Sequence, residues 1–330
     1  AMIKDPQNPI DPLVQADDIR AKAQAERAKQ KTFSECAEAY LDLNRSTWAN
    51  KKHAQQWENT LKTYAYPHFG DVRISEVETG HISSCLLPIW KTKTETATRL
   101  RGRIEKILDW AKVSGYRNGN NPALWKGHLD KILPKPSKVS KVVHHPALPY
   151  EKVGTFVEGL RSRNGTAARA LEFTILTAAR SGEVRGATWD EIDLNKKLWV
   201  IPAERMKMGR KHEVPLPDAA ISILRALPRT DSLYIFPGAK VSAPMSDMTL
   251  SKVIRRMGLT DITVHGFRSS FRDWAAETTA YPREVCEMAL AHAIESETEA
   301  AYRRGNLLIK RVRLMADWSK YCEMAQPSAS

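Results

Sequence analysis

A run of prolines and lysines near the middle of the chain sets the first limit on its fold. Between Ile132 and Tyr150 the sequence places four prolines and three lysines in one short stretch. Proline removes a backbone amide donor and biases the preceding residue toward extended backbone, so this stretch is a poor candidate for a helix or sheet. It predicts a basic linker, residues 132–149, with a domain boundary near Lys141. The residues concerned are Pro134, Pro136, Pro146 and Pro149, with Lys135, Lys138 and Lys141.

The length and charge of the chain agree with two domains and a polyanionic partner. The 330 residues suffice for about two domains. A net charge of +13 and a pI near 9.5 favour nucleic acid, although many basic proteins bind nothing specific. No segment approaches the roughly 20 apolar residues of a membrane span, and the start has no apolar signal-peptide core. The four cysteines are widely spaced without a zinc-ligand pattern, which is typical of reduced thiols in the cytosol.

The first half of the chain predicts a small helical domain after a polar segment. Residues 1–31 are polar and offer little to a core. Thr32, with a glutamate three residues later, forms a capping box that starts a helix. A second helix is predicted from about Lys51 to Tyr64, ended by Pro67 and Gly70.

A third helix begins near Thr94 and completes a helical domain over residues 32–131. Arg99 and Arg103 flank its apolar stripe. These basic residues are either a solvated helix face or a face that lies on phosphates, and the first half alone favours the solvated face. The stripe is Ala97, Leu100, Ile104, Ile107, Leu108 and Ala111.

From Tyr150 onward the sequence predicts mostly helices, with two short strands. The segment from Gly165 to Ala179 is apolar enough for a buried helix. Residues 197–202 and 212–216 are predicted to be strands joined by a basic loop, residues 204–211. The whole chain is therefore expected to be mainly α with a small antiparallel β-sheet. Further helices are predicted at about 217–227, 247–257, 267–278, 282–290 and 307–320.

Several residues in this half are of the types that phosphate chemistry requires. Arg180 follows an apolar helix and begins a Ser-Gly turn, which exposes its guanidinium at a helix end. Alone, it is equally typical of a cation stabilised by the helix dipole. Glu183 is predicted to orient Arg180 or to brace a neighbouring turn. His265 and Arg268 are spaced i and i+3 at the start of a predicted helix, so they share one face, although such a pair arises easily by chance.

A histidine and a tyrosine near the C-terminus extend this set. His292 follows a predicted helix, which suggests a helix end pointing into a cleft, although a lone histidine is most often a satisfied core or capping residue. Tyr302 is one of nine tyrosines. Its distance from His292 and the two arginines after it distinguish it from Tyr281, which precedes a proline, and from the nearly terminal Tyr321.

Two arginines, two histidines and a late tyrosine, in this order, suit an attack on a DNA phosphodiester. A tyrosine oxygen can hold the 3′-phosphate as an ester, so strand exchange needs neither ATP nor a metal. Fixed arginines neutralise the charge that develops on the phosphate oxygens, because a guanidinium stays charged and can hold two oxygens. The departing 5′-hydroxyl also needs a proton, which lysine or histidine can donate.

In this order and context the motifs resemble the tyrosine recombinase family, specifically the phage-type integrases. The resemblance covers about Thr32 to Cys322. It implies a helical core-DNA-binding domain followed by a mixed α/β catalytic domain, residues 150–330. It also implies a site-specific recombinase that integrates or excises a mobile element through a 3′-phosphotyrosine intermediate. The catalytic residues it implies are Arg180, His265, Arg268, His292 and Tyr302.

The family carries its general-acid lysine at a hairpin tip that reaches into DNA. Here Lys207 is preferred, because it follows the Ile-Pro-Ala-Glu-Arg strand end as in phage-type relatives. Arg210 and Lys211 compete for the role, and a simple solvated basic loop is the other interpretation. Many family members have glycine before the histidine that corresponds to His292, whereas this chain has Ala291.

The resemblance also implies partners. It predicts double-stranded DNA attachment sites, a homo-tetramer on DNA that is largely monomeric when free, a DNA-bending host factor and an excisionase, in the cytoplasm and nucleoid of a bacterial host. No cofactor, metal or membrane is expected. Relatives usually carry an additional N-terminal arm-binding domain, and Ala1-Met2 is typical of a cloning remnant, so an N-terminally truncated chain is expected. The predicted DNA-binding residues are Arg99, Arg103, Lys135, Lys138, Lys141, Arg210 and Lys211.

Two other functions and one question of assembly remain open. A type IB topoisomerase uses similar residues to relax supercoils, and a DNA-binding remnant of an integrase would have no activity; the complete residue set argues against the remnant. The C-terminal helix is expected either to pack on its own domain or to dock on a neighbouring protomer. Its apolar positions are Leu308, Val312, Met315 and Ser319, extended by Leu314, Trp318, Tyr321 and Cys322.

Overall fold

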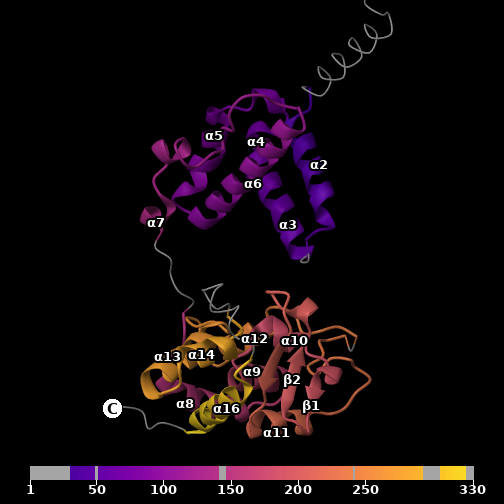
Figure 1. The fold of residues 1–330 in the computed structure, drawn as a ribbon, viewed down its shortest axis with the longest axis vertical. Helices are drawn as coiled ribbons and strands as arrows, with labels where there is room; N and C mark the ends of the chain where they lie inside the picture. Colours follow the sequence, from indigo (N-terminus) through magenta and orange to yellow (C-terminus); the bar gives the residue numbers. More distant parts are fainter. Residues whose placement is uncertain (1–29, 49–50, 141–145, 241, 293–304, 325–330) are drawn as a thin grey trace, which may run out of the picture. The chain divides into compact units, whose positions relative to one another are not determined.

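The computed structural model describes residues 30–48, 51–140, 146–240, 242–292 and 305–324 of the chain. The chain forms two compact units, Ala1–Val142 and Val143–Ser330, each with its own hydrophobic core (Figure 1). Within the described residues the fold is mainly helical with one small antiparallel sheet, which confirms the predicted fold class. None of the helices in these ranges is long and apolar enough to cross a membrane.

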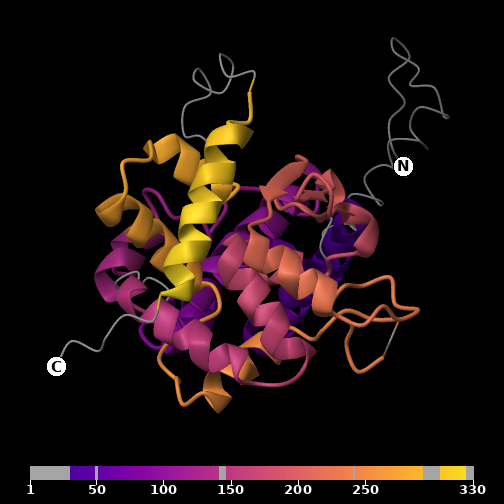
Figure 2. The ribbon, with the colours of Figure 1, turned by 90° about the horizontal axis from the view of Figure 1, so that it is seen from below.

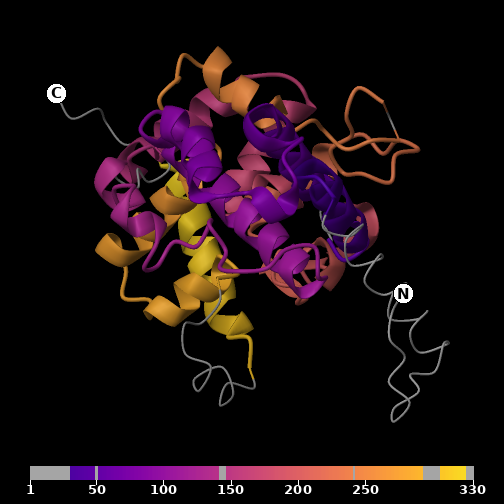
Figure 3. The same ribbon diagram turned by 90° about the horizontal axis from the view of Figure 1, so that it is seen from above.

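The first unit is built of helices, which Figure 3 shows in indigo to magenta. In chain order they are α2 (Phe33–Arg45), α3 (Lys51–Thr60), the π-helical turn η1 (Leu61–Ala65), α4 (Tyr66–Phe69), the 3₁₀ turn η2 (Ile74–Glu76), α5 (Thr79–Trp90), α6 (Thr94–Val113), the 3₁₀ turn η3 (Leu129–Lys131) and α7 (Pro136–Val139). The sequence analysis did not predict α5, and it assigned α7 to the linker.

The start of α2 has the predicted capping box. The backbone N–H of Glu35 donates to Thr32 Oγ1 at 3.2 Å, and the backbone N–H of Thr32 donates to Glu35 Oε2 at 2.8 Å. Because the first N–H groups of a helix lack partners within it, the two bonds stabilise this end by about 1 kcal/mol. They also lower the pKa of Glu35 below its ordinary value, through the backbone bond first.

The second predicted helix does not end at Pro67. A π-helical turn, Leu61–Ala65, connects α3 to α4, and the helical path continues through Pro67 to Phe69. A proline is tolerated in the first turn of a helical segment, since its missing N–H needs no partner there. Gly70 then ends the segment; a Cβ at this position would lie 2.8 Å from the carbonyl oxygen of Tyr66.

Helix α6 has the predicted apolar stripe, and all six of its residues are fully buried. Arg103, predicted to contact DNA beside this stripe, is only 7% exposed. Its Nη1 donates to the carbonyl of Gln56 at 2.7 Å and to Thr60 Oγ1, and its guanidinium lies 5.4 Å from the centre of the Trp57 ring. The phosphate-binding prediction for Arg103 is therefore wrong, because the side chain joins α6 to α3 inside the unit.

The second unit surrounds a small sheet with helices. Its helical elements are η4 (Tyr150–Lys152), α8 (Val153–Arg161), α9 (Thr166–Thr177), α10 (Ser181–Arg185), η5 (Trp189–Glu191), η6 (Ala203–Arg205), α11 (Asp218–Ala226), α12 (Thr249–Arg256), α13 (Gly266–Thr278), α14 (Arg283–Ala289) and α16 (Leu308–Glu323). The predicted buried helix is α9. Part of the segment between α11 and α12, drawn in orange, extends outward from its unit in Figure 2.

The sheet contains the two predicted strands and one short strand that was not predicted. Its order is β1 (Ile192–Asp193), β2 (Leu198–Ile201) and β3 (His212–Pro215), and both neighbouring pairs are antiparallel. Along β2, Trp199 and Ile201 are buried while their neighbours are half-buried, which is the alternation of a strand with one face on the core. Ile201 lies opposite His212, so the basic loop connects two directly paired residues.

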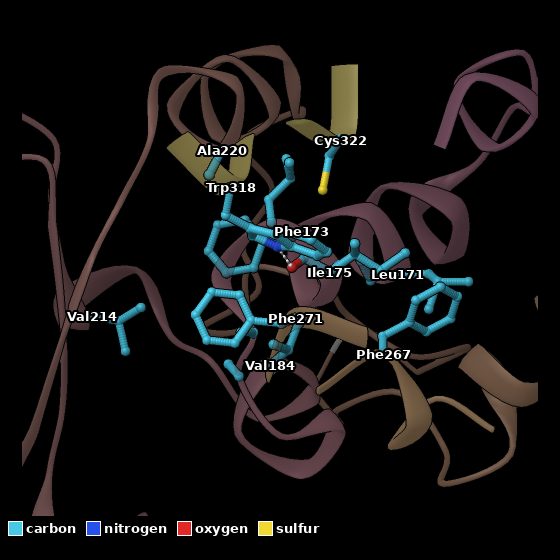
Figure 4. Close-up of a cluster of buried hydrophobic side chains, with 14 of the residues drawn as sticks. Leu171, Phe173, Ile175, Val184, Val214, Ala220, Phe267, Phe271, Trp318 and Cys322 are labelled. Atoms are coloured by element: carbon cyan, nitrogen blue, oxygen red, sulfur yellow. Dashed lines mark hydrogen bonds between the residues drawn. The ribbon is translucent and has the colours of Figure 1, made fainter. Parts of the chain in front are cut away.

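Helix α16 is part of the core of its own unit in this structure, which is the first of the two arrangements that the sequence left open. Trp318 is fully buried between Phe271 and Trp274, and its indole N–H donates to the carbonyl of Ile175 at 2.8 Å (Figure 4). Figure 2 shows the yellow helix alongside α13 and α14. Val312, expected on the docking face, is 49% exposed. Moving the helix elsewhere would expose Trp318 and Cys322, so it packs on its own domain.

Candidate active site

Arg180 stands at the start of a short helix that follows an abrupt turn. Helix α9 ends at Thr177, and Ala178 adopts a left-handed backbone with φ of 49°. Arg180 is the residue before α10, where a positive charge is unfavourable because it faces the positive end of the helix dipole. Glu183 compensates: its Oε2 accepts from the Arg180 backbone N–H at 2.8 Å and its Oε1 from Nη1 at 2.7 Å. The carboxylate thus fixes the orientation of the guanidinium.

Arg268 projects from α13 into the unit and is only 5% exposed. Its Nη1 donates to the carbonyl of Ala178 at 2.5 Å, and its Nη2 donates to the carbonyl of Leu290 at 2.6 Å. Its Nε is buried without a hydrogen-bond partner among the described residues. Burial, followed by the charge of Arg180, lowers the pKa of Arg268 to about 10, so the side chain is charged at neutral pH.

His292 lies just beyond α14 and is half exposed. Its Nε2 is 3.1 Å from Nη2 of Arg268, and its Nδ1 is 2.6 Å from Oε2 of Glu287. The predicted helix end is confirmed, since α14 stops at Ala289. Ala291 takes a left-handed backbone with φ of 50°, a conformation that favours glycine.

The two arginines meet at the carbonyl group of Leu290, and His292 contacts one of them. Nη2 of Arg180 donates to the carbonyl of Ala291 at 3.1 Å and, more weakly, to that of Leu290 at 3.5 Å. Arg268 donates to the same Leu290 carbonyl. The backbone turn after α14 therefore holds two guanidinium groups and one imidazole together. The three residues belong to or adjoin α10, α13 and α14, which Figure 1 labels. Neighbouring cations repel each other, so this arrangement is suited to an anion.

His265 lies at the start of α13, one turn before Arg268, and is exposed. The entry to this helix is constrained by Gly266, where a Cβ would approach the carbonyl oxygen of Pro146 to 2.3 Å. The backbone N–H of Thr263 donates to the same oxygen at 3.0 Å. This packing fixes where α13 begins and hence the position of His265.

The basic loop between β2 and β3 carries Lys207. The side chain of Lys207 is exposed and makes no ion pair with the described residues. Lys211 differs, because its ammonium lies 3.0 Å from Oε1 of Glu213. Arg205 anchors the loop: it pairs with Glu191 and donates to the carbonyl of Glu183. Lys207 is thus the lysine of this loop whose charge is free.

The other predicted DNA-binding residues differ in their surroundings. Arg99 is exposed and pairs with Glu95 at 2.9 Å, one turn away on α6. Lys135, Lys138 and Arg210 are exposed, and Lys141 lies outside the described residues. These positions are accessible to phosphate, unlike Arg103.

Tyr302 lies outside the described residues, between His292 and Gly305. The two tyrosines weighed against it are both engaged in packing. Tyr281 donates its hydroxyl to Oδ2 of Asp317 at 2.6 Å, and burial followed by this bond raises its pKa to about 12. Tyr321 stacks on Trp318 with ring centres 6.0 Å apart.

The sequence analysis missed three residues that support this site. Glu287 contacts His292, Arg272 donates from Nε to Oε1 of Glu287 at 2.8 Å, and Arg205 supports Glu183. The spacing from Glu287 to His292 is a usable signal, since residues five apart meet when a helix ends in a left-handed residue. Among the described residues no group of three His, Cys, Asp or Glu side chains is placed to hold a metal ion.

Family models match both halves of the chain. Residues 33–128 match the phage integrase central domain, and residues 151–307 match the phage integrase family. An integrase of Enterobacteria phage P4 is 30% identical over 96% of this chain and 74% of its own length. The chain belongs to the phage integrase family. It is a tyrosine-type site-specific recombinase, as the ordered motifs predicted. The prophage integrase IntA of Escherichia coli K12 is 29% identical over 91% of this recombinase and 72% of its own length.

Solved structures have the same fold at low identity. A lambda integrase (75–356) dimer bound to a core site aligns with a TM-score of 0.63 and 18% identity, over 84% of this chain and 96% of its own. A lambda integrase tetramer bound to a Holliday junction aligns with a TM-score of 0.64 and 17% identity, over 88% of this chain and 84% of its own. The Tn1549 transposon integrase in complex with circular intermediate DNA aligns with a TM-score of 0.61 and 12% identity, over 86% of this chain and 99% of its own.

Proposed function

We propose that Arg180, Arg268 and His292 hold the scissile phosphate of a DNA site while Tyr302 attacks it. The observation that carries this proposal is that Arg180 and Arg268 both donate to the Leu290 carbonyl while His292 contacts Arg268, so that the three side chains lie together. Two guanidinium groups held this close, one of them oriented by Glu183, favour binding of a phosphodiester, and they favour the more highly charged transition state further.

In the proposed reaction the phenol oxygen of Tyr302 forms a bond to phosphorus as the bond to the 5′-oxygen breaks. The product is a 3′-phosphotyrosine ester and a free 5′-hydroxyl, so the bond energy is retained for rejoining. Lys207 donates the proton that the departing 5′-oxygen takes. Support for Lys207 over Lys211 comes from its free ammonium, because the ion pair of Lys211 with Glu213 would have to break first. His265 is a further catalytic residue of the proposal, and it lies at the start of α13, one turn before Arg268.

Binding of DNA is proposed to rest on both units. Exposed cations of the first unit, Arg99, Lys135 and Lys138, with Arg210 of the second, are placed to contact phosphates, which gives an affinity that falls steeply with salt. By analogy with the lambda integrase dimers and tetramer, the chain assembles as a homo-oligomer on paired attachment sites. The proposal also includes a tetramer on DNA and a monomer in the absence of DNA. It further includes action at the host nucleoid, together with a DNA-bending host factor and an excisionase.

A nicked attachment site tests the nucleophile. The nick lets the short 5′ fragment diffuse away after cleavage, so a covalent protein–DNA adduct accumulates. Wild-type protein should form the adduct, and Tyr302→Phe should bind the site equally well and form none. Tyr281→Phe is the matched control and should cleave normally. Adduct formation by Tyr302→Phe would overturn the assignment.

A substrate with sulfur at the 5′-bridging position tests Lys207. Sulfur leaves without protonation, so it should restore cleavage to Lys207→Ala. Rescue of Lys211→Ala alone would move the role to Lys211.

A further inference from the structure

The turn after α14 brings two residues five positions apart into contact. The backbone N–H of His292 donates to the carbonyl of Glu287 at 3.0 Å, and that of Ala291 donates to the carbonyl of Met288 at 3.2 Å. With Ala291 in the left-handed region, this pair of bonds is the Schellman ending of a helix. Such an ending folds the residue after the left-handed one back over the last turn. His292 therefore lies against Glu287, with Nδ1 only 2.6 Å from Oε2.

Two arginine side chains contact the other carboxylate oxygen of Glu287. Nε of Arg272 on α13 donates to its Oε1 at 2.8 Å, and Nε of Arg283 lies 3.9 Å from the same oxygen. Burial, the largest single influence, acts to raise the pKa of Glu287, but the bonds from Arg272 and His292 outweigh it and the pKa lies below its ordinary value. Glu287 is consequently a carboxylate at neutral pH, with one oxygen for Arg272 and the other for His292.

The contact with Glu287 determines which ring nitrogen of His292 carries a hydrogen and which one faces Arg268. A ring nitrogen that faces a carboxylate carries a hydrogen, so Nδ1 is the donor and Nε2 faces Arg268. Arginine has no hydrogen-bond acceptor, so Nη2 of Arg268 donates to Nε2, which carries no hydrogen in this arrangement. The two contacts of the ring thus select one tautomer and one orientation.

We propose that Glu287 is a positioning residue for the recombination reaction: it accepts the Nδ1 hydrogen of His292 and so fixes the ring with Nε2 directed toward Arg268 and the scissile phosphate. Arg272 acts through Glu287 by fixing its carboxylate. This inference rests on the proposed role of His292, but it adds a residue outside the set of arginines, histidines, lysine and tyrosine.

The test compares Glu287→Gln with wild type in single-turnover adduct formation on the nicked site. Glutamine keeps the size of the side chain and an oxygen for Arg272 but removes the negative charge. The cleavage rate at neutral pH should fall by about ten- to a hundredfold, at or below the range that loss of a general acid–base group causes. Site affinity should be unchanged. In ¹⁵N NMR of the free protein, the His292 ring should lose its preference for a hydrogen on Nδ1.

Two further variants separate a positioning role from a structural one. Glu323→Gln neutralises a carboxylate of the same unit that pairs with Arg161 at 3.2 Å, away from the site, and should leave the cleavage rate and the ring tautomer unchanged. Arg272→Lys keeps a cation beside Glu287 and should retain more activity than Arg272→Gln. An unchanged cleavage rate and an unchanged ring tautomer in Glu287→Gln would overturn the inference while wild type still forms adduct. Absence of adduct in wild type would instead overturn the proposed function.

Discussion

Four arginines among the described residues are almost fully buried, and two of them, Arg103 in the first unit and Arg268 in the second, differ in their bonding partners. Arg103 in α6 donates to Gln56 and Thr60 and lies over the Trp57 ring, so the groups that it contacts are neutral. Arg268 in α13 lies beside Arg180 and His292, and its Nε is buried without a partner among the described residues. Burial is the first cause of the lowered pKa of both, followed by the charge of Arg99 at Arg103 and by the charge of Arg180 at Arg268, whose pKa is lowered to about 10.

The difference shows which features of a buried arginine indicate function. A buried guanidinium whose bonds go to neutral groups is a structural cross-link, and its contribution is to stability. A buried guanidinium beside other cations is destabilised until an anion arrives, and structures tolerate such an arrangement mainly at functional sites. Charge in the sequence does not separate the two cases, whereas the neighbours in the fold do.

The largest effect is expected from a second member of the cation cluster. Arg180→Ala should lower the rate of adduct formation by about 10³-fold or more, by analogy with other arginines in phosphoryl transfer. Affinity for an uncleaved half-site should change far less, because most of it comes from other phosphate contacts. Single-turnover cleavage and a mobility-shift titration measure the two quantities. Arg225→Ala, an exposed arginine on α11, is the control, and equal losses of rate and affinity in Arg180→Ala would contradict the account.

A core substitution in the second unit tests whether its stability is separate from that of the first. Trp318→Ala should lower the free energy of unfolding of the second unit by about 3–5 kcal/mol, through lost packing and the lost bond to Ile175. The transition of the first unit, which holds Arg103, should not move. Val312→Ala on the exposed side of α16 should change stability by less than about 0.5 kcal/mol. Similar losses from both variants in a denaturant titration would argue against the buried face of α16.

His212, near the cation cluster, makes the stability of the second unit depend on pH, whereas among the described residues no such group contacts Arg103. Its pKa is lowered to about 4 in the fold, by burial first and then by Arg311, against an ordinary value of about 6.5. The unfolded chain therefore binds more protons between these values, and the stability of the second unit should fall as pH drops from about 6.5 toward 4, by at most a few kcal/mol. Thermal unfolding across this range should show a smaller decline in His212→Gln. An identical decline would contradict the assignment.

The smallest effect concerns the turn after α14, which carries the carbonyls of Leu290 and Ala291. Ala291→Gly should stabilise the second unit by about 0.5–1 kcal/mol, because glycine accepts the left-handed backbone without steric cost. Ala289→Gly, at the end of α14, should instead lower stability by about 1 kcal/mol. Chemical denaturation resolves the opposite signs, and a loss in both variants would show that Ala291 is not strained.

The elements that the sequence predicts well are those with a local, periodic pattern. The buried stripe of α6 and the alternation along β2 follow from spacing alone, because one side of each element must meet a core. The capping box at Thr32 is equally local. Helix α5 has a weaker pattern and a proline, Pro88, inside it, so nothing in its spacing distinguished it from a connection.

What the sequence did not predict depends on contacts between distant segments. Arg103 was placed outside because charged residues are rarely buried without partners, and its partners lie on another helix. The residue types of Arg180, Arg268 and His292 were sufficient to propose a phosphate site. Their support from the Leu290 carbonyl and from Glu287 appears only when the turn after α14 is folded.

The central claim is that the cluster around Arg268 is a phosphate site and the surroundings of Arg103 are not. The most direct test compares the rate of adduct formation on a nicked site, at saturating protein, between Arg268→Ala and Arg103→Ala. The account predicts a loss of about 10³-fold or more for Arg268→Ala. For Arg103→Ala it predicts a near wild-type rate with a first unit less stable by about 1–3 kcal/mol. A folded Arg103→Ala protein that binds but fails to cleave, or an Arg268→Ala protein that cleaves normally, would contradict it.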